Sequence, residues 1–405
     1  TRFTRVYCNS PLCAPSRARL ATGLRPHRTG VRDNQQDTDP EAVTVFELLR
    51  NAGYRVGTTG KCDLHKASDD FSVTGWRPLL GRYGFTEAVD QGGKHNGRML
   101  GFPTPHDPHT AHLHAEGLAP AYLEDAERRV ALRRDHQAQA DWPSPLPRCS
   151  YTDDFTGSAS LRLLDSVPRG APWCLWVNFP GPHEPFDPPR ALQARYDGVD
   201  FDPPVNNHET QNHHAQLRRN YAAMISGIDD WVGWLIDAVE RRGELDRTVI
   251  VFASDHGEML GDHDRWYKKV PWEGSVRVPL IMAGPGIAAG RERDDPVELV
   301  DLAATLPELA GIKTPEHWDS RSLVPLLRGD KTPAPHRDVV TSTMLGQWRM
   351  ITDGRWKLFD WPGERGVELY DLSRDPQELN DVSEQHADAV APLRERLDEE
   401  LPLAD

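Results

Sequence analysis

The stretch CAPSRARLATG, residues 13–23, lies near the start of the 405-residue chain and carries its most specific pattern. Proline fixes its own φ and lacks a backbone N–H, so Pro15 suits the first turn of a helix, with Cys13 expected just outside it. The unpaired N–H groups and dipole at this helix end attract an anion, and Arg17 and Arg19 add positive charge. The stretch therefore predicts an anion site beside a cysteine, although a lone free cysteine is more often a buried structural thiol.

Two further polar blocks follow predicted strands in the first half of the chain. The block TGKCDLH, residues 59–65, comes after a short strand predicted at 54–58. Ligands gather at the carboxyl ends of strands in open α/β sheets, so Lys61 is expected at a ligand site, with an ordinary solvated lysine as the alternative. The apolar run at 172–179 predicts a parallel strand covered on both faces. The sequence PHEP follows at 182–185, where His183 taken alone would more often be structural.

A third predicted strand, at 248–253, is followed by SDHGE, residues 254–258. Hard divalent cations prefer carboxylate oxygen, and two adjacent residues that follow a strand can both face one ion because the backbone turns there. Asp255 and His256 are therefore candidate metal ligands. The block GDHDRWYKK continues at 261–269 and contains Lys268 and Lys269.

These blocks, in this order, resemble the type I sulfatases of the alkaline phosphatase superfamily. In that family the cysteine is oxidised to a formylglycine, whose hydrated aldehyde attacks sulfur with one hydroxyl and expels sulfate with the other. The resemblance implies hydrolysis of a small sulfated substrate, such as an aryl sulfate, after maturation by a formylglycine-generating enzyme. The residues to which it assigns catalytic roles are Cys13, Arg17, Lys61, His183 and Lys268.

The resemblance also implies a divalent metal. In the family, the position of Asp255 binds the ion, usually calcium, and the position of His256 supplies a further ligand, together with the formylglycine formed from Cys13. Histidine at this second position is found in phosphonate and phosphate ester hydrolases, which use manganese or zinc, and in some sulfatases.

One substrate-side position departs from the family pattern. Many relatives carry a histidine two residues after the lysine, whereas this chain carries Asp63 there and His65 two residues later. Either His65 substitutes, or Asp63 contacts a cationic or hydroxylated substrate. His263 is a further candidate substrate contact, with a structural role as its alternative.

The implied fold is an α/β sandwich like that of alkaline phosphatase, with a mostly parallel central sheet between helices. We predict a catalytic domain at 1–335 and a small α+β subdomain at 336–405. Strands predicted at 339–344, 348–352 and 356–359 form an antiparallel sheet, with a hairpin at Asp353-Gly354, and a terminal helix follows at 384–401.

The other predicted elements are less specific. Helices are expected at about 40–52, 155–167, 217–242 and 297–310, the first with Asp39 as its N-cap. Residues 66–150 are predicted as a largely solvated loop, apart from a helix at 116–136, and 313–337 as a Pro-rich linker. The histidines of the loop, His95, His106, His109, His112 and His114, follow no metal-ligand spacing.

Composition excludes several classes of protein. The formal charge of −15 argues against a general nucleic-acid-binding protein. No run is long and apolar enough to span a membrane. The five cysteines show no paired spacing, so they predict no disulfide framework. The compartment stays open.

Two alternatives remain beside sulfate ester hydrolysis. The first keeps the fold and the nucleophile and hydrolyses phosphonate monoesters or phosphodiesters. The second follows from the start of the sequence, because relatives carry an upstream strand and an Asp-Asp metal-binding pair that this sequence does not contain. It predicts a gap in or beside the parallel sheet and a catalytically inactive chain that only binds anions.

Overall fold

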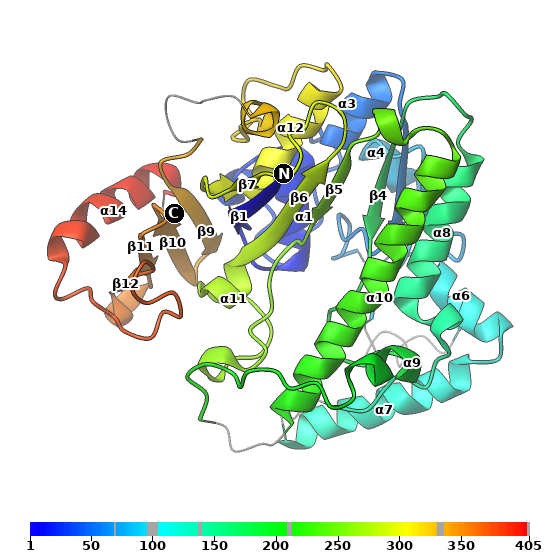
Figure 1. The fold of residues 1–405 in the computed structure, drawn as a ribbon, viewed down its shortest axis with the longest axis horizontal. Coiled ribbons are helices and arrows are strands. Elements are labelled where there is room, and N and C mark those ends of the chain that lie inside the picture. Colours follow the sequence, from blue (N-terminus) through cyan, green and yellow to red (C-terminus); the bar gives the residue numbers. More distant parts are fainter. Residues whose placement is uncertain (69, 95–103, 137–139, 209–212, 330–335, 403–405) are drawn as a thin grey trace.

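The computed structural model describes the whole chain except residues 69, 95–103, 137–139, 209–212, 330–335 and 403–405. Its strands form three sheets (Figure 1). The first is a mixed sheet in the order β5-β6-β1-β7, with β8 also pairing with β1. Its strands are β1 (Arg2–Tyr7), β5 (Ile250–Ala253), β6 (Arg277–Ala283), β7 (Glu292–Arg293) and β8 (Val297–Glu298).

The second sheet is parallel and carries the first lysine block. Its order is β3-β2-β4, with β2 (Arg55–Gly60) between β3 (Glu87–Asp90) and β4 (Trp173–Asn178). Gly60 lies in register with both Asp90 and Asn178, so the three strands end at one edge. That edge receives Lys61, as the sequence predicts.

The predicted central sheet is therefore divided in two. Among the described residues, β4 and β5 each have one edge that pairs with no other strand. The prediction that β4 is covered on both faces is wrong, because residues 173–177 are all half-buried. A strand with one unpaired edge leaves part of its apolar surface in contact with solvent.

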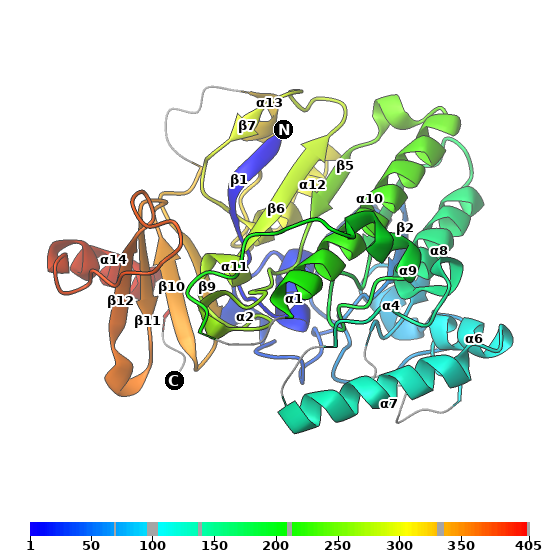
Figure 2. The ribbon, with the colours of Figure 1, turned by 60° about the horizontal axis from the view of Figure 1, so that its bottom comes forward.

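Helices cover both faces of the parallel sheet (Figures 1 and 2). Gly57 of β2 lies against Leu163 of α8 (Thr152–Ser166), and α10 (His214–Arg241) packs outside α8. The adjacent Val56 points to the other face, where it packs with α3 (Val45–Asn51). Further helices there are α1 (Cys13–Thr22) and α12 (Leu302–Leu309).

Short helices complete the main body. They are α2 (Pro26–Thr29), α4 (Pro78–Arg82), α9 (Arg190–Gln193), α11 (Glu273–Val276) and α13 (Val324–Arg328). In the described part of the chain, no helix has both the length and the apolar character needed to cross a membrane.

The third sheet forms a C-terminal subdomain at one end of the molecule (Figures 1 and 2). It is antiparallel throughout, in the order β12-β11-β10-β9, and Leu393 and Leu397 of α14 (Ala387–Glu400) pack on it. Its strands are β9 (Val340–Met344), β10 (Trp348–Thr352), β11 (Trp356–Asp360) and β12 (Val367–Asp371). The predicted boundary at 336 adjoins residues outside the described part and stays a prediction.

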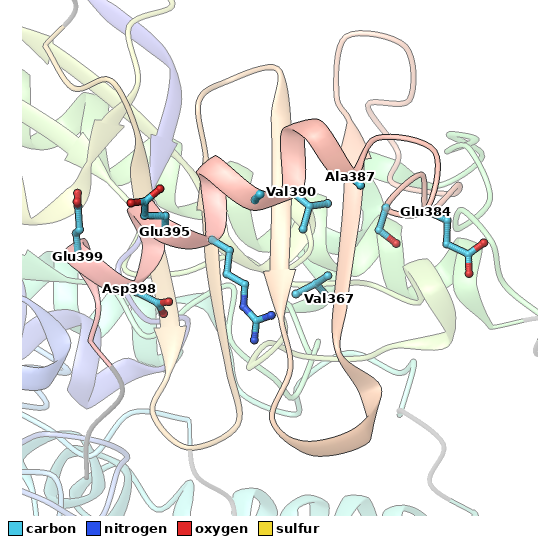
Figure 3. A pocket seen from close by; sticks show the side chains of 10 residues that line it. Val367, Glu384, Ala387, Val390, Glu395, Asp398 and Glu399 are labelled. Atoms are coloured by element: carbon cyan, nitrogen blue, oxygen red, sulfur yellow. The ribbon is translucent and has the colours of Figure 1, made fainter.

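An open groove runs along this subdomain between α14 and β12 (Figure 3). Val367 and Val390 lie at its apolar part, and Arg394 and Glu395 are among its charged lining residues. None of the predicted site residues lines it.

The predicted loop at 66–150 is wrong where α4, β3 and α6 (Pro108–Ala115) form, while the helix predicted at 116–136 is observed as α7 (Ala119–His136). Asp107 caps α6 by accepting a hydrogen bond from the Thr110 amide. His109 is buried and His112 is half-buried, and both bind Ser150, so neither is freely solvated. The other histidines of the group are half-buried at 106 and 114, and position 95 lies outside the described residues.

Three other predicted bounds need correction. The helix predicted from residue 40 begins at Val45, because Thr44 rather than Asp39 caps it. The helix predicted from 297 begins at Leu302, because residues 297–298 form β8 beside β1. The linker predicted at 313–337 contains α13.

Candidate active site

Cys13 lies at the centre of a buried cluster of polar side chains. Its side chain is buried, and Sγ lies 3.2 Å from Nζ of Lys61 and 3.4 Å from Nε2 of His256. Cys13 is the first residue of α1 rather than lying outside it, and Pro15 is the third. The next backbone N–H, that of Ala14, donates to Oδ1 of Asn34 at 3.1 Å. The positive end of α1 thus faces the cluster, as the sequence predicts.

Positive charge surrounds the thiol. Burial alone would raise the pKa of Cys13, but the ammonium groups of Lys61 and Lys66 hold it well below its ordinary value. His256 and Lys268 act in the same direction. This environment favours an anion at position 13.

Arg17 joins the strand ends to the nucleophile helix. Its guanidinium donates to Oδ2 of Asp255 at 2.9 Å, to the carbonyl of Lys61 at 2.6 Å and to Oδ1 of Asn178 at 2.7 Å. These acceptors follow or end β5, β2 and β4, respectively. One buried cation therefore fixes three separate segments around Cys13.

His183 and Lys268 form a pair on another side of the cluster. Nδ1 of His183 donates to the carbonyl of Glu184 at 2.8 Å, so Nε2 is left to accept a hydrogen bond from Nζ of Lys268 at 2.8 Å. Burial, followed by the charges of Lys268 and Lys61, lowers the pKa of His183 to about 4. The imidazole is consequently neutral at physiological pH, so its Nε2 lone pair can accept the hydrogen bond from Lys268.

The substrate-side residues occupy different surroundings. Asp63 is buried and pairs with Lys61 and Lys66. His65 is also buried, with Nε2 2.7 Å from Oδ2 of Asp90, and this hydrogen bond raises its pKa despite burial.

His263 stacks on the Trp272 ring at a centroid distance of 5.2 Å, and a hydrogen bond joins it to the backbone of Gln377. The structure thus places Asp63 beside Lys61, whereas His65 and His263 bind other partners. Lys269, the neighbour of Lys268, is exposed.

The candidate metal ligands converge. One ligand atom from each of Cys13, Asp255 and His256 lies within 4.8 Å of the others. Nδ1 of His256 donates to the carbonyl of Gly257 at 2.9 Å, so the Nε2 lone pair faces Cys13. A deprotonated ring nitrogen held by a carbonyl on its other side is a usual metal ligand, and the set fits a divalent ion.

Sequence reasoning missed three residues of this cluster, namely Asn34, Lys66 and Asn178. Asn178 is the last residue of β4, so the rule that places ligands at the carboxyl ends of strands could have found it. Asn34 and Lys66 lie on irregular segments, and no periodic signal marks them.

The fold and this buried cluster define a hydrolase that acts on an anionic ester. The sulfatase family model matches residues 1–312, and a model described as "N-sulphoglucosamine sulphohydrolase, C-terminal" matches 261–402. The chain belongs to the sulfatase family and is a sulfatase, an enzyme that hydrolyses sulfate esters.

Curated relatives agree with this assignment. Choline-sulfatase of Rhizobium meliloti (strain 1021) is 31% identical over 418 residues, which cover 95% of this chain and 75% of that protein. Arylsulfatase K of Xenopus laevis is 28% identical over 418 residues, which cover 98% of this chain and 74% of the relative. The predicted family and enzyme class are confirmed.

Solved structures confirm the fold. The structure of BT4656 in complex with its substrate D-glucosamine-2-N,6-O-disulfate has a TM-score of 0.74 at 20% identity, covering 98% of this chain and 90% of that chain. The phosphonate monoester hydrolase SpPMH from Silicibacter pomeroyi has a TM-score of 0.80 at 22% identity, covering 100% and 88%. The α/β class with an alkaline-phosphatase-like architecture is therefore confirmed.

Proposed function

We propose that this chain hydrolyses a small sulfate monoester with a formylglycine formed from Cys13 and a divalent metal bound beside it. The observation that carries the proposal is the position of Cys13. It lies at the N-terminus of α1, 3.2 Å from Lys61 and 3.4 Å from His256, inside a buried cationic cluster. A sulfate group is an anion, and such a cluster stabilises it.

The chemistry of formylglycine explains why a cysteine stands at this position. One hydroxyl of its hydrate attacks sulfur and displaces the alcohol of the ester. Deprotonation of the second hydroxyl then expels sulfate and re-forms the aldehyde. A serine could form the sulfate ester but could not release it in this way. A formylglycine-generating enzyme in the host would carry out the conversion.

The metal would be held by Asp255, His256 and an oxygen of the modified residue 13. When bound, a divalent ion stabilises the deprotonated nucleophile and the charge on the sulfate oxygens. Calcium is the family's usual ion, whereas the imidazole of His256 suits manganese or zinc better. The unmodified thiolate of Cys13 is a soft ligand that would favour zinc, so conversion to an oxygen ligand shifts the preference toward harder ions.

The remaining residues bind the anion and handle the proton. Lys61 donates from Nζ to the atom at position 13 and stabilises the nucleophile as an anion. Lys268 is oriented by the hydrogen bond from its Nζ to Nε2 of His183, so its N–H groups are placed to stabilise the leaving oxygen and to donate to it. Arg17 keeps the strand ends in place through its bonds to Asp255 and Asn178.

A second candidate is hydrolysis of a phosphonate monoester or a phosphodiester by the same machinery. His256 beside Asp255 supports it, because histidine at this position is found in such hydrolases. SpPMH shares the fold with this chain, which leaves the reaction open.

The test is to produce the protein with and without a formylglycine-generating enzyme and to analyse the peptide that contains Cys13. Conversion lowers its mass by about 18 Da. Rates on 4-nitrophenyl sulfate and on a phenyl phosphonate ester are then compared in the converted protein, with its metal content measured. The expected result is faster sulfate hydrolysis that depends on conversion.

Cys13→Ser is the matched control, and it should release about one equivalent of nitrophenol and then stop. Faster cleavage of the phosphonate would replace the sulfatase proposal by the second candidate. Converted protein that binds no metal and cleaves neither ester would support the inactive, anion-binding alternative.

A further inference from the structure

Asp63 holds two ammonium groups behind the nucleophile. Its Oδ2 lies 3.2 Å from Nζ of Lys61 and 2.6 Å from Nζ of Lys66. The side chains of Lys61, Asp63 and Lys66 are 4%, 1% and 5% exposed, so solvent does not weaken these ion pairs. Lys61 is therefore bound on one side by Asp63 and on the other by the sulfur of Cys13.

The backbone folds so that this arrangement is possible. Asp63 adopts φ +58°, a left-handed conformation that is uncommon for a residue other than glycine. The chain turns there, and Lys66, three residues later, returns to the same carboxylate.

The stem of Lys61 is confined as well. A Cβ atom at Gly93 would lie 2.8 Å from Cδ of Lys61, so the backbone at Gly93 packs directly against the lysine. The ammonium of Lys61 thus has little freedom beyond its bonds to Asp63 and Cys13. A side chain held in this way loses little entropy when it binds an anion.

Asp63 is poorly placed to bind substrate. Both lysines form ion pairs with the same oxygen, Oδ2, and the buried Oδ1 has no hydrogen-bond partner among the described residues. Burial would raise the pKa of Asp63, but Lys61 and Lys66 hold it well below its ordinary value, so the group is a carboxylate. Its charge is already neutralised inside the protein.

We propose that Asp63 and Lys66 are positioning residues for Lys61. In this proposal, which rests on the proposed sulfatase function, Asp63 keeps the Lys61 ammonium on the atom at position 13. Lys66 pairs with the same carboxylate and offsets part of its negative charge, so that Asp63 does not draw Lys61 away from the nucleophile. The role replaces the substrate contact expected at Asp63 from the sequence.

Kinetics of Asp63→Asn and Lys66→Met on 4-nitrophenyl sulfate test the proposal. A misplaced Lys61 stabilises the transition state less, whereas substrate binding changes little. We therefore expect kcat to fall about 30-fold in Asp63→Asn and about 5-fold in Lys66→Met, with KM changed less than about threefold. Lys66→Arg should restore kcat, because it keeps the charge. Lys313→Met, which removes an exposed lysine, is the matched control and should behave as wild type.

The double variant Asp63→Asn/Lys66→Met provides a second readout. The two residues act through one lysine, so its loss in kcat should be close to that of Asp63→Asn alone rather than the product of the two losses. Independent, multiplicative losses would contradict the proposal. So would a Lys66→Met variant that raises KM at unchanged kcat, since that result identifies a substrate contact.

A crystallographic measurement keeps this test separate from the proposed function. In Asp63→Asn, the Lys61 ammonium should leave its position about 3.2 Å from the atom at residue 13. If it stays there, Asp63 does not position it and the inference is overturned. If wild-type protein cleaves no sulfate ester, the proposed function fails, whereas this structural result still decides the role of Asp63.

Discussion

Lys61 and Lys268 reach the site from two regions that differ in how their backbone is held. Lys61 directly follows the central strand of a parallel sheet, and its amide donates to the carbonyl of Asn178 at 3.0 Å. Lys268 lies within the long segment between β5 and α11, outside regular sheet structure. The first lysine is fixed by strand pairing and the second by contacts of an irregular loop.

The segment around Lys268 is strained. Five of its residues other than glycine have positive φ values, namely Leu260, His263, Asp264, Tyr267 and Lys269. Each costs about 1 kcal/mol relative to an ordinary backbone conformation. Such a conformation persists only where the surroundings determine it strongly.

Those surroundings include the C-terminal subdomain. Nε1 of Trp348, on β10, donates to the carbonyl of Lys269 at 2.8 Å. Glu258 accepts hydrogen bonds from the amides of Tyr267 and Leu260 within the segment. One half of the site is thus held by the sheet, whereas the other half depends on how the C-terminal subdomain packs against the Lys268 segment.

The largest change in stability is expected when a side chain is added at the glycine that precedes Lys61. A Cβ at Gly60, which has φ +80°, would lie 2.0 Å from the carbonyl oxygen of Asn178. Gly60→Ala is expected to lower the free energy of unfolding by about 3 kcal/mol or more. Lys269→Gly removes a strained side chain, so it should stay within about 1 kcal/mol of wild type.

Urea unfolding of both variants at one pH measures this difference. An equal loss in the two variants would show that the loop backbone is as tightly determined as the strand end. The proposed difference in backbone rigidity between the two regions would then be wrong.

The same contrast explains what the sequence could predict. Lys61, His183 and Asp255 all follow apolar runs. Parallel pairing of β2 with β4 brings the ends of the first two runs together, as the sequence rule predicts. Asp255 instead follows β5 of the mixed sheet, which pairs antiparallel with β6, so its place beside Cys13 depends on how the two sheets pack. The pairing of Asp63 with Lys66 depends on a left-handed residue in a short turn, which no periodicity reveals.

Helix starts show a second limit of sequence reasoning. The dipeptide Asp-Pro occurs at 39–40 and at 107–108. At 107–108 the dipeptide begins α6, with Asp107 as the N-cap. At 39–40 it begins no helix, and α3 starts only after its N-cap Thr44. Local capping chemistry is alike in the two places, so tertiary packing decides which residue starts the helix.

The two lysine regions meet at the segment that carries His183, and Asp153 anchors it. Oδ1 of Asp153 accepts a hydrogen bond from the Gly181 amide at 2.7 Å, and burial raises its pKa to about 6. The folded value lies above the unfolded value of 3.8, so the folded state binds the proton more tightly. Stability from this group is present at low pH and is lost as pH rises through about 6.

Asp153→Asn should therefore stabilise the protein at pH 8 by roughly 2 kcal/mol, because the asparagine is never charged. The gain should shrink as pH falls toward 4.5, where wild type is protonated. Thermal or urea unfolding of both proteins across this range measures the difference. If the increase in the free energy of unfolding does not vary with pH, it comes from packing at Gly181 and not from removal of the charge.

The smallest change in activity and stability is expected where Trp348 of the subdomain binds the Lys268 segment. Trp348→Phe keeps most of a buried aromatic side chain and removes the N–H that binds the Lys269 carbonyl. We expect kcat on an aryl sulfate to fall about fivefold and stability to fall by about 1 kcal/mol. Trp356→Phe, on the neighbouring strand, is the matched control because the ring of Trp356 contacts His386 instead.

A series of aryl sulfates with different leaving groups sharpens this last test. Lys268 is proposed to stabilise the leaving oxygen, so Trp348→Phe should slow substrates with poor leaving groups more than those with good ones. Asp63→Asn acts through Lys61 at the nucleophile, so its loss should depend far less on the leaving group. Equal leaving-group dependence in the two variants would mean that both lysines stabilise the same atom in the transition state, although their backbones are held in different ways.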